Sequence, residues 1–243
     1  MILIMLAIAA TTLLGGLIAL SFRDKLHLIL GFSAGAVVAV ALFDLLPESI
    51  ALSSQSYSIS LIMLLVVCGF VGYMLIDRFS HLHTHTHDDN IDCNNTNHTR
   101  PASWAIIGIS VHSLLDGIAI GLAYQVSPAV GIVIAIAVLA HVFSDGMNTV
   151  GLAMRGNVSL KNAFRWLALD AIAPSIGIII SLFITLPKDT LGLVLAVFSG
   201  FFLYLGASDL LPESHHRHPT VWTTIMSLLG MIIIYIAVRL SGL

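Results

Sequence analysis

The sequence predicts an all-α integral membrane protein with eight transmembrane helices. Of its 243 residues, 58% are hydrophobic and only 9% are charged, whereas an ordinary soluble domain is about 25% charged. Apolar stretches of about 20 residues, the length that crosses a hydrocarbon core, lie near residues 1 to 20, 27 to 46, 59 to 76, 103 to 124, 129 to 152, 164 to 186, 190 to 210 and 221 to 240. Little sequence remains outside them, so we expect a single transmembrane domain over residues 1–243.

The first span lacks a basic segment before it, and we interpret it as a retained helix rather than a secretion signal. With eight spans drawn, most basic residues fall on one side: Arg23, Lys25, Arg78, Arg100, Arg155, Lys161, Arg165 and Arg217. Only Lys188 and Arg239 fall on the other. The positive-inside rule then predicts that both termini are extracytoplasmic, in a multi-pass protein of the cell membrane. A net charge of −3 does not suggest a nucleic-acid partner.

The motif DLLPES occurs twice, at residues 44–49 and 209–214, at the ends of the second and seventh spans. Five crossings separate the copies, so they point in opposite directions. This is typical of the inverted repeats of transporters, and predicts that spans 1–3 and spans 6–8 are repeats around central spans 4 and 5. We expect the proline of each copy to end its helix. The acidic residues of the two copies are candidate ion relays at the two mouths: Asp44, Glu48, Asp209 and Glu213.

A second repeat, HxxxDG, begins at His112 in span 4 and at His141 in span 5. Residues four apart lie on the same face of a helix, so each span offers an imidazole and a carboxylate as a pair. Small residues let helices approach closely in membranes. We therefore expect spans 4 and 5 to approach each other at four glycines: Gly117, Gly121, Gly146 and Gly151.

The two buried acids, Asp116 and Asp145, indicate a metal ion. Each costs roughly 2.5 to 3.5 kcal/mol at the centre of a spanning helix. A divalent ion bound by two carboxylates and two neutral imidazoles has no net charge, which a medium of low dielectric tolerates best. These ligands suit zinc, ferrous iron, manganese, cobalt or nickel rather than cuprous copper. The predicted metal-binding residues are therefore His112, Asp116, His141 and Asp145.

Other interpretations of these polar residues stay open. The two pairs also fit a purely structural role that holds spans 4 and 5 together. We expect Ser113 and Ser144 to bond the backbone of their own helices. For Asp170 in span 6 the sequence allows two roles, a cap at the start of the helix or an additional carboxylate at the site.

One long polar loop, residues 77–100, separates spans 3 and 4 and contains HLHTHTHDDN. Its alternating histidines are typical of a flexible tract that gathers metal, although a solvated linker rich in histidine is the alternative. The candidate ligands in this cytoplasmic loop are His81, His83, His85 and His87.

Two other functional classes deserve comparison with metal transport. A zinc-dependent intramembrane hydrolase needs a general base beside the metal, but no HExxH motif is present and Val142 follows His141. A haem protein would use His112 and His141 as axial ligands, which leaves the aspartate four residues after each histidine unexplained. We therefore expect a transporter rather than an enzyme.

The eight spans, the His-rich loop, LLPE at the end of span 2 and the HxxxDG motif together resemble the ZIP family of divalent metal transporters. The resemblance covers essentially the whole chain. It implies import toward the cytoplasm of zinc in the first place, with iron, manganese, cobalt or cadmium as further substrates. It implies no cofactor besides the transported metal, and a possible homodimer as the assembly.

The chain departs from the family pattern at a second metal position. Where many members carry ligands for a second ion, this sequence has Ser113, Val142 and, before Pro174, Ala173. The first position keeps all four ligands. We therefore predict a mononuclear site.

Overall fold

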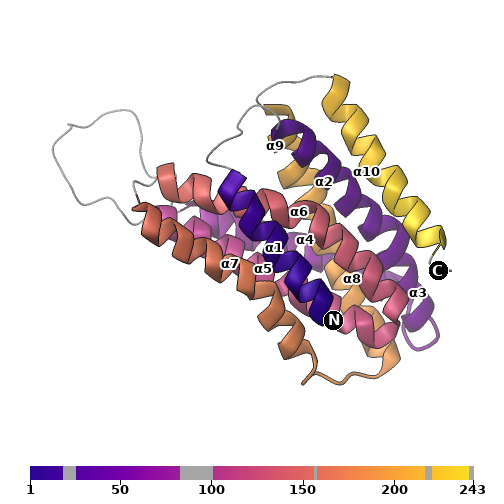
Figure 1. The fold of residues 1–243 in the computed structure, drawn as a ribbon. Helices are drawn as coiled ribbons and strands as arrows, with labels where there is room; N and C mark the ends of the chain where they lie inside the picture. Colours follow the sequence, from indigo (N-terminus) through magenta and orange to yellow (C-terminus); the bar gives the residue numbers. More distant parts are fainter. Residues whose placement is uncertain (19–25, 83–100, 156–157, 217–220, 241–243) are drawn as a thin grey trace.

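The computed structural model describes residues 1–18, 26–82, 101–155, 158–216 and 221–240, and these residues form helices and short connections without a strand. The elements in chain order are α1 (Ile2–Ile18), α2 (Leu26–Val40), the π-helical turn η1 (Ala41–Leu45), α3 (Leu46–Ser53), α4 (Ile59–Leu82), α5 (Pro101–Val126), α6 (Pro128–Arg155), α7 (Leu160–Ser181), α8 (Lys188–Tyr204), the π-helical turn η2 (Leu205–Leu210), α9 (Leu211–His216) and α10 (Val221–Leu240) (Figure 1).

The predicted all-α membrane architecture is confirmed. Seven helical spans are long and apolar enough to cross a membrane, and α1 is a shorter apolar helix of 17 residues. That length is at the lower limit for a crossing. Two of the spans begin with a serine that caps the helix. Ser58 and Ser127 accept hydrogen bonds from the backbone N–H groups of Leu61 and Val130, in the first turns of α4 and α6, as N-cap residues do.

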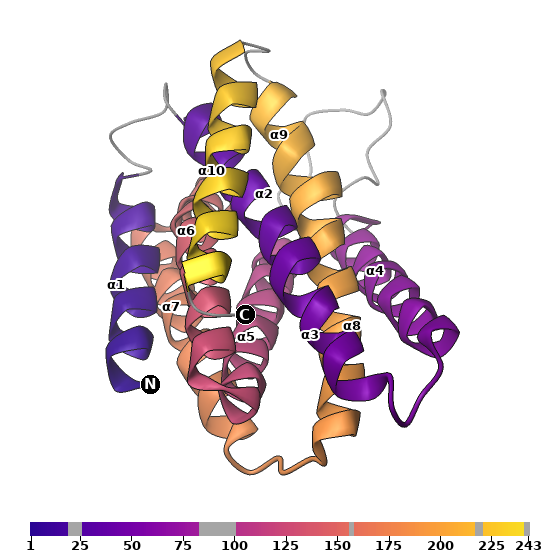
Figure 2. The same cartoon turned by 90° about the vertical axis from the view of Figure 1, so that its right-hand side faces the viewer.

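The helices form two halves. One contains α1, α5, α6 and α7, and the other contains α2, α3, α4, α8, α9 and α10 (Figure 2). Within the first half α1 packs on α6 and α5 on α7, and within the second α2 packs on α10 and α4 on α8. The predicted repeat matches span 1 with span 6, span 2 with span 7, span 3 with span 8, and span 4 with span 5. Under this matching the α1–α6 pair corresponds to the α5–α7 pair, and the α2–α10 pair corresponds to the α4–α8 pair. The packing therefore follows the predicted inverted repeat.

Glycines from both members of each pair bring these helices together. A Cβ atom at any of them would meet backbone atoms of the partner helix: Gly15 and Gly146 for α1 and α6, Gly117 and Gly177 for α5 and α7, Gly35 and Gly230 for α2 and α10, and Gly69 and Gly200 for α4 and α8. The prediction that glycines join spans 4 and 5 is therefore wrong. Gly117 and Gly121 face α7, Gly146 faces α1, and Gly151 has no such neighbour within 4 Å. Periodicity places a glycine on a helix, but it does not identify the helix that packs there.

Both copies of DLLPES form a π-helical turn followed by further helix. The N–H of Leu46 bonds to the carbonyl of Ala41, and the N–H of Leu211 bonds to that of Gly206, five residues earlier in each case. The expectation that the prolines end these helices is wrong. Proline is tolerated in the first turn of a helix because its missing N–H has no partner there, and after the wider π turn a new helical segment, α3 or α9, begins.

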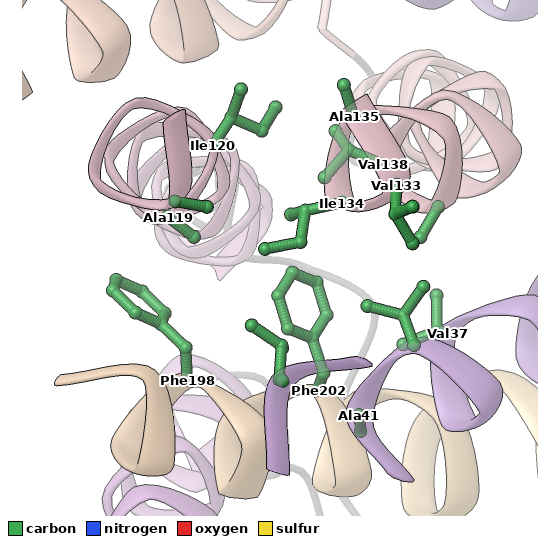
Figure 3. Close-up of a cluster of buried hydrophobic side chains, with 14 of the residues drawn as sticks. Val37, Ala41, Ala119, Ile120, Val133, Ile134, Ala135, Val138, Phe198 and Phe202 are labelled. Atoms are coloured by element: carbon green, nitrogen blue, oxygen red, sulfur yellow. The ribbon is translucent and has the colours of Figure 1, made fainter. Parts of the chain in front are cut away.

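An apolar cluster fills the centre between the halves (Figure 3). Phe198 of α8 faces Ala119 of α5, Phe202 of α8 faces Ile134 of α6, and Val37 of α2 lies beside Phe202. These residues are almost fully buried. The cluster residues of α5 and α6 lie between the HxxxDG motifs and the α5–α6 connection. They therefore cover the motifs on that side.

Candidate metal centre

The four predicted metal ligands meet in space. Each of His112, Asp116, His141 and Asp145 offers one ligand atom, these atoms lie within 4.8 Å of one another, and all four residues are buried. Helices α5 and α6 each contribute one histidine and, one turn later, one aspartate. This quartet is the one group of at least three such side chains found among the described residues.

The spacing within the quartet suits a single ion. Asp116 Oδ2 lies 2.9 Å from His141 Nε2 and 3.2 Å from His112 Nε2, and Asp145 Oδ2 lies 3.8 Å from both nitrogens. Ligand bonds of about 2.0 to 2.2 Å place neighbouring ligands of a tetrahedral zinc about 3.3 Å apart. The observed separations bracket that value, so a small movement of Asp145 completes the coordination.

His141 is oriented by its second ring nitrogen. Nδ1 lies 3.0 Å from the carbonyl of Ala137. A carbonyl only accepts hydrogen bonds, so Nδ1 donates one to Ala137 and Nε2 points into the site. Asp116 Oδ2 lies 2.9 Å from Nε2. At this distance the two atoms share a hydrogen bond when Nε2 carries a proton, and both offer lone pairs to a cation when it does not.

Several polar atoms of the quartet are buried and have no hydrogen-bond partner among the residues that the structure describes. They are both ring nitrogens of His112, Oδ1 of Asp116 and Oδ2 of Asp145. Leaving a buried polar atom unpaired costs about 1 to 3 kcal/mol, and more if it is charged. Such atoms are rare in folded proteins, and their concentration at one point fits a site whose ligand atoms bind a cation.

The first of the two roles expected for Asp170 is wrong, and the second, an additional carboxylate at the site, stays a prediction. It lies in the middle of α7, fully buried, so it does not cap the helix. Its two oxygens accept hydrogen bonds from Ser113 Oγ, at 2.6 Å, and from Thr149 Oγ1, at 3.1 Å. The expectation that Ser113 bonds its own backbone is therefore wrong. Ser144 Oγ, also expected to bond backbone, is buried without a partner among the described residues.

These contacts tie α7 to the two ligand-bearing helices. Ser113 follows His112 directly, and Thr149 lies one turn after Asp145. Thr149 was not among the residues predicted from the sequence, although its spacing from Asp145 places it on the same face of α6. Asp170 is not part of the quartet in this structure.

The candidate relay residues lie in the two π-helical turns and in the short helices that follow them. Asp44, in η1, is 2% exposed, and both of its oxygens lack a partner among the described residues. Glu48 and Asp209 are half-buried, and Asp209 lies in η2. The side chain of Glu213 is outside the described residues. So are the predicted loop ligands His83, His85 and His87, and the side chain of His81 in the last turn of α4.

Together, the apolar spanning helices are those of an integral membrane protein, and the buried quartet fits a metal site. Comparison with known proteins identifies the family to which the chain belongs. The sequence model described as "ZIP Zinc transporter" matches residues 83–236, more than half of the chain. The chain therefore belongs to the ZIP family, as its motifs predicted.

Curated relatives agree with this assignment. "Zinc transporter foi" of Drosophila melanogaster is 28% identical over 131 residues, which are 54% of this chain and 19% of that protein. Human "Zinc transporter ZIP10" is 30% identical over 47% of this chain and 14% of its own length. Human "Zinc transporter ZIP4" is 26% identical over 48% of this chain and 18% of its own length. The matches thus span less than a fifth of these relatives, all of which are named as transporters.

Proposed function

We propose that this protein transports divalent transition-metal ions across the membrane through a mononuclear site formed by His112, Asp116, His141 and Asp145. Zinc is the proposed main substrate, in keeping with the names of the relatives, with iron, manganese, cobalt and cadmium as further candidates. The proposed direction is toward the cytoplasm, as the resemblance to the ZIP family implies.

One observation carries this proposal, namely the unpaired buried atoms of the quartet. Two carboxylates and two neutral imidazoles balance one divalent charge and leave nothing for a second ion. A purely structural pair of histidine and aspartate would satisfy its own hydrogen bonds. Here His112 has none from either nitrogen among the described residues, so the arrangement suits an ion better than it suits helix association.

The path of the ion is proposed from what lies on either side of the quartet. Toward the α5–α6 connection the apolar cluster of Figure 3 blocks passage. Asp44 follows the cluster residue Ala41 by one turn and is proposed to receive the ion at that mouth, together with Glu48. Its position in a π-helical turn supports this role, since such turns are frequent at functional sites. Asp209 and Glu213 take the equivalent role at the other mouth.

Metal uptake into proteoliposomes tests the site. Replacing any member of the quartet by alanine is expected to abolish saturable zinc uptake. Ser110→Ala is the matched control, because Ser110 is a buried polar residue of α5 that bonds only the carbonyl of Ile106 in its own helix. Uptake at the wild-type rate in all four quartet variants would defeat the proposal. Mass measurement of the purified protein in detergent tests the proposed homodimer.

A further inference from the structure

The two histidines of the quartet are supported in different ways. A histidine that binds a metal usually donates its other N–H to a carboxylate, a carbonyl or water, which fixes the orientation of the ring. His141 does so, through the carbonyl of Ala137. His112 is buried, with only 4% of its surface exposed, and neither of its ring nitrogens has a hydrogen-bond partner among the described residues.

Two aromatic rings contact the His112 imidazole and support it where a hydrogen bond supports His141. Phe201 stacks on the imidazole, with ring centroids 5.5 Å apart and planes inclined by 19°. Tyr73 meets the imidazole edge to face, at 5.6 Å and 63°. The two aromatic rings also contact each other, at 4.2 Å and 70°. Both are almost fully buried, so the imidazole lies against two mutually packed rings.

These rings come from the other half of the molecule. Tyr73 belongs to α4 and Phe201 to α8, whereas His112 belongs to α5. Tyr204, one turn after Phe201, packs on Tyr73 and donates a hydrogen bond to Asp77 Oδ2 at 3.0 Å. The aromatic support of His112 is therefore anchored within the half formed by α2, α4, α8 and α10.

We propose that Phe201 and Tyr73 are positioning residues for the metal ligand His112, and that the metal affinity of the site therefore depends on how the two halves are packed. This inference rests on the proposed metal site. When the halves pack as in this structure, the His112 ring is held toward Asp116 and the ion. A movement of one half against the other removes the stacked ring, frees the imidazole and weakens binding.

Zinc affinity of purified variants tests the positioning role, measured by competition with a chromophoric chelator and paired with KM and maximal rate of uptake. Phe201→Leu is expected to raise both the zinc Kd and KM roughly tenfold, the lower end of the range for groups that orient a metal ligand. Phe201→Tyr keeps the ring and is expected to retain wild-type values. Phe70→Leu is the matched control, because Phe70 is a half-buried ring of α4 that packs on Tyr204 and is not part of the proposed ion path.

The outcomes separate this inference from the proposed function. If His112→Ala abolishes zinc binding while Phe201→Leu behaves like Phe70→Leu, the positioning role is overturned and the metal site stands. If His112→Ala binds zinc like the wild type, the site itself fails. A loss of maximal rate with unchanged Kd in Phe201→Leu would also overturn the positioning role, since it would show only a structural effect.

Hydrogen exchange tests the coupling between the halves. Coupling of binding to packing is reciprocal, so zinc is expected to slow amide exchange in α4 and α8 of the wild type. Phe201→Leu is expected to lose this protection, and Phe70→Leu to keep it. Equal protection by zinc in Phe201→Leu and the wild type would contradict the coupling.

Discussion

Replacement of Thr149 by valine probes the hydrogen bonds that join α7 to the ligand-bearing helices. Asp170 is fully buried and accepts hydrogen bonds from Thr149 Oγ1 and Ser113 Oγ. Valine has nearly the shape of threonine but no hydroxyl. The substitution therefore removes one of two donors from a buried carboxylate while it leaves the packing almost unchanged.

The expected loss is about 1 to 1.5 kcal/mol in the free energy of unfolding. Hydrogen bonds to charged groups contribute about 1.5 to 3 kcal/mol in soluble proteins, whereas bonds between membrane helices average about 0.6 and reach about 1.7. The Thr149 bond, at 3.1 Å, belongs in the upper part of the membrane range. Ser113→Ala is expected to cost more, because its bond is 2.6 Å long. The double variant is expected to lose more than the sum, because Asp170 then keeps neither donor.

Equilibrium unfolding in mixed micelles, titrated with dodecyl sulfate and followed by circular dichroism, measures these losses. Thr149→Ser is the control, because it keeps the hydroxyl and loses only a methyl group. If Thr149→Val proves as stable as Thr149→Ser, the hydroxyl contributes nothing and the reasoning about Asp170 is refuted.

Three further predictions concern packing, ligand strength and pH. Gly146→Ala is expected to destabilise the fold by roughly 1 to 3 kcal/mol, since its Cβ would overlap the backbone of α1. Gly151→Ala in the same helix has free space and is expected to be neutral or stabilising. The same unfolding titration compares the two variants. Asp116→Asn is expected to weaken zinc binding more than Asp145→Asn, because Asp116 lies closer to both histidines; chelator competition gives both Kd values, and the reverse order would contradict the geometry. The KM for zinc uptake is expected to rise as pH falls from about 7.5 to about 5.5, because protons compete with metal for the imidazoles; a KM that stays constant over this range would show that protons do not compete.

Much of the fold could be predicted because lipid imposes simple rules on sequence. Apolar runs long enough to cross the bilayer marked the spanning helices, although the second and the seventh continue as helix beyond their predicted ends. The duplicated DLLPES motif indicated the inverted repeat that the helix pairing follows. The path of the chain around Pro47 and Pro212 could not be predicted, because a π-helical turn leaves no distinct signal in one sequence. The sequence also did not indicate which helix packs on which, as the glycines of α5 and α6 show.

The quartet could be predicted because its spacing is local. A histidine and an aspartate four residues apart share a helix face, and two copies in antiparallel neighbours meet. Contacts between distant segments were not accessible in this way. Asp170 was recognised as unusual, but its donors Ser113 and Thr149 depend on how α7 packs. The stacking of Phe201 on His112 depends on the packing of the two halves, which no periodicity encodes.

Anomalous diffraction from zinc-loaded protein tests the central claim most directly, namely that one divalent ion is bound by the quartet between α5 and α6. The expected result is a single zinc peak within the spanning region, about 2 Å from Nε2 of His112 and His141 and from a carboxylate oxygen of Asp116 and Asp145. Two peaks at this position, or a spanning region without zinc, would contradict it.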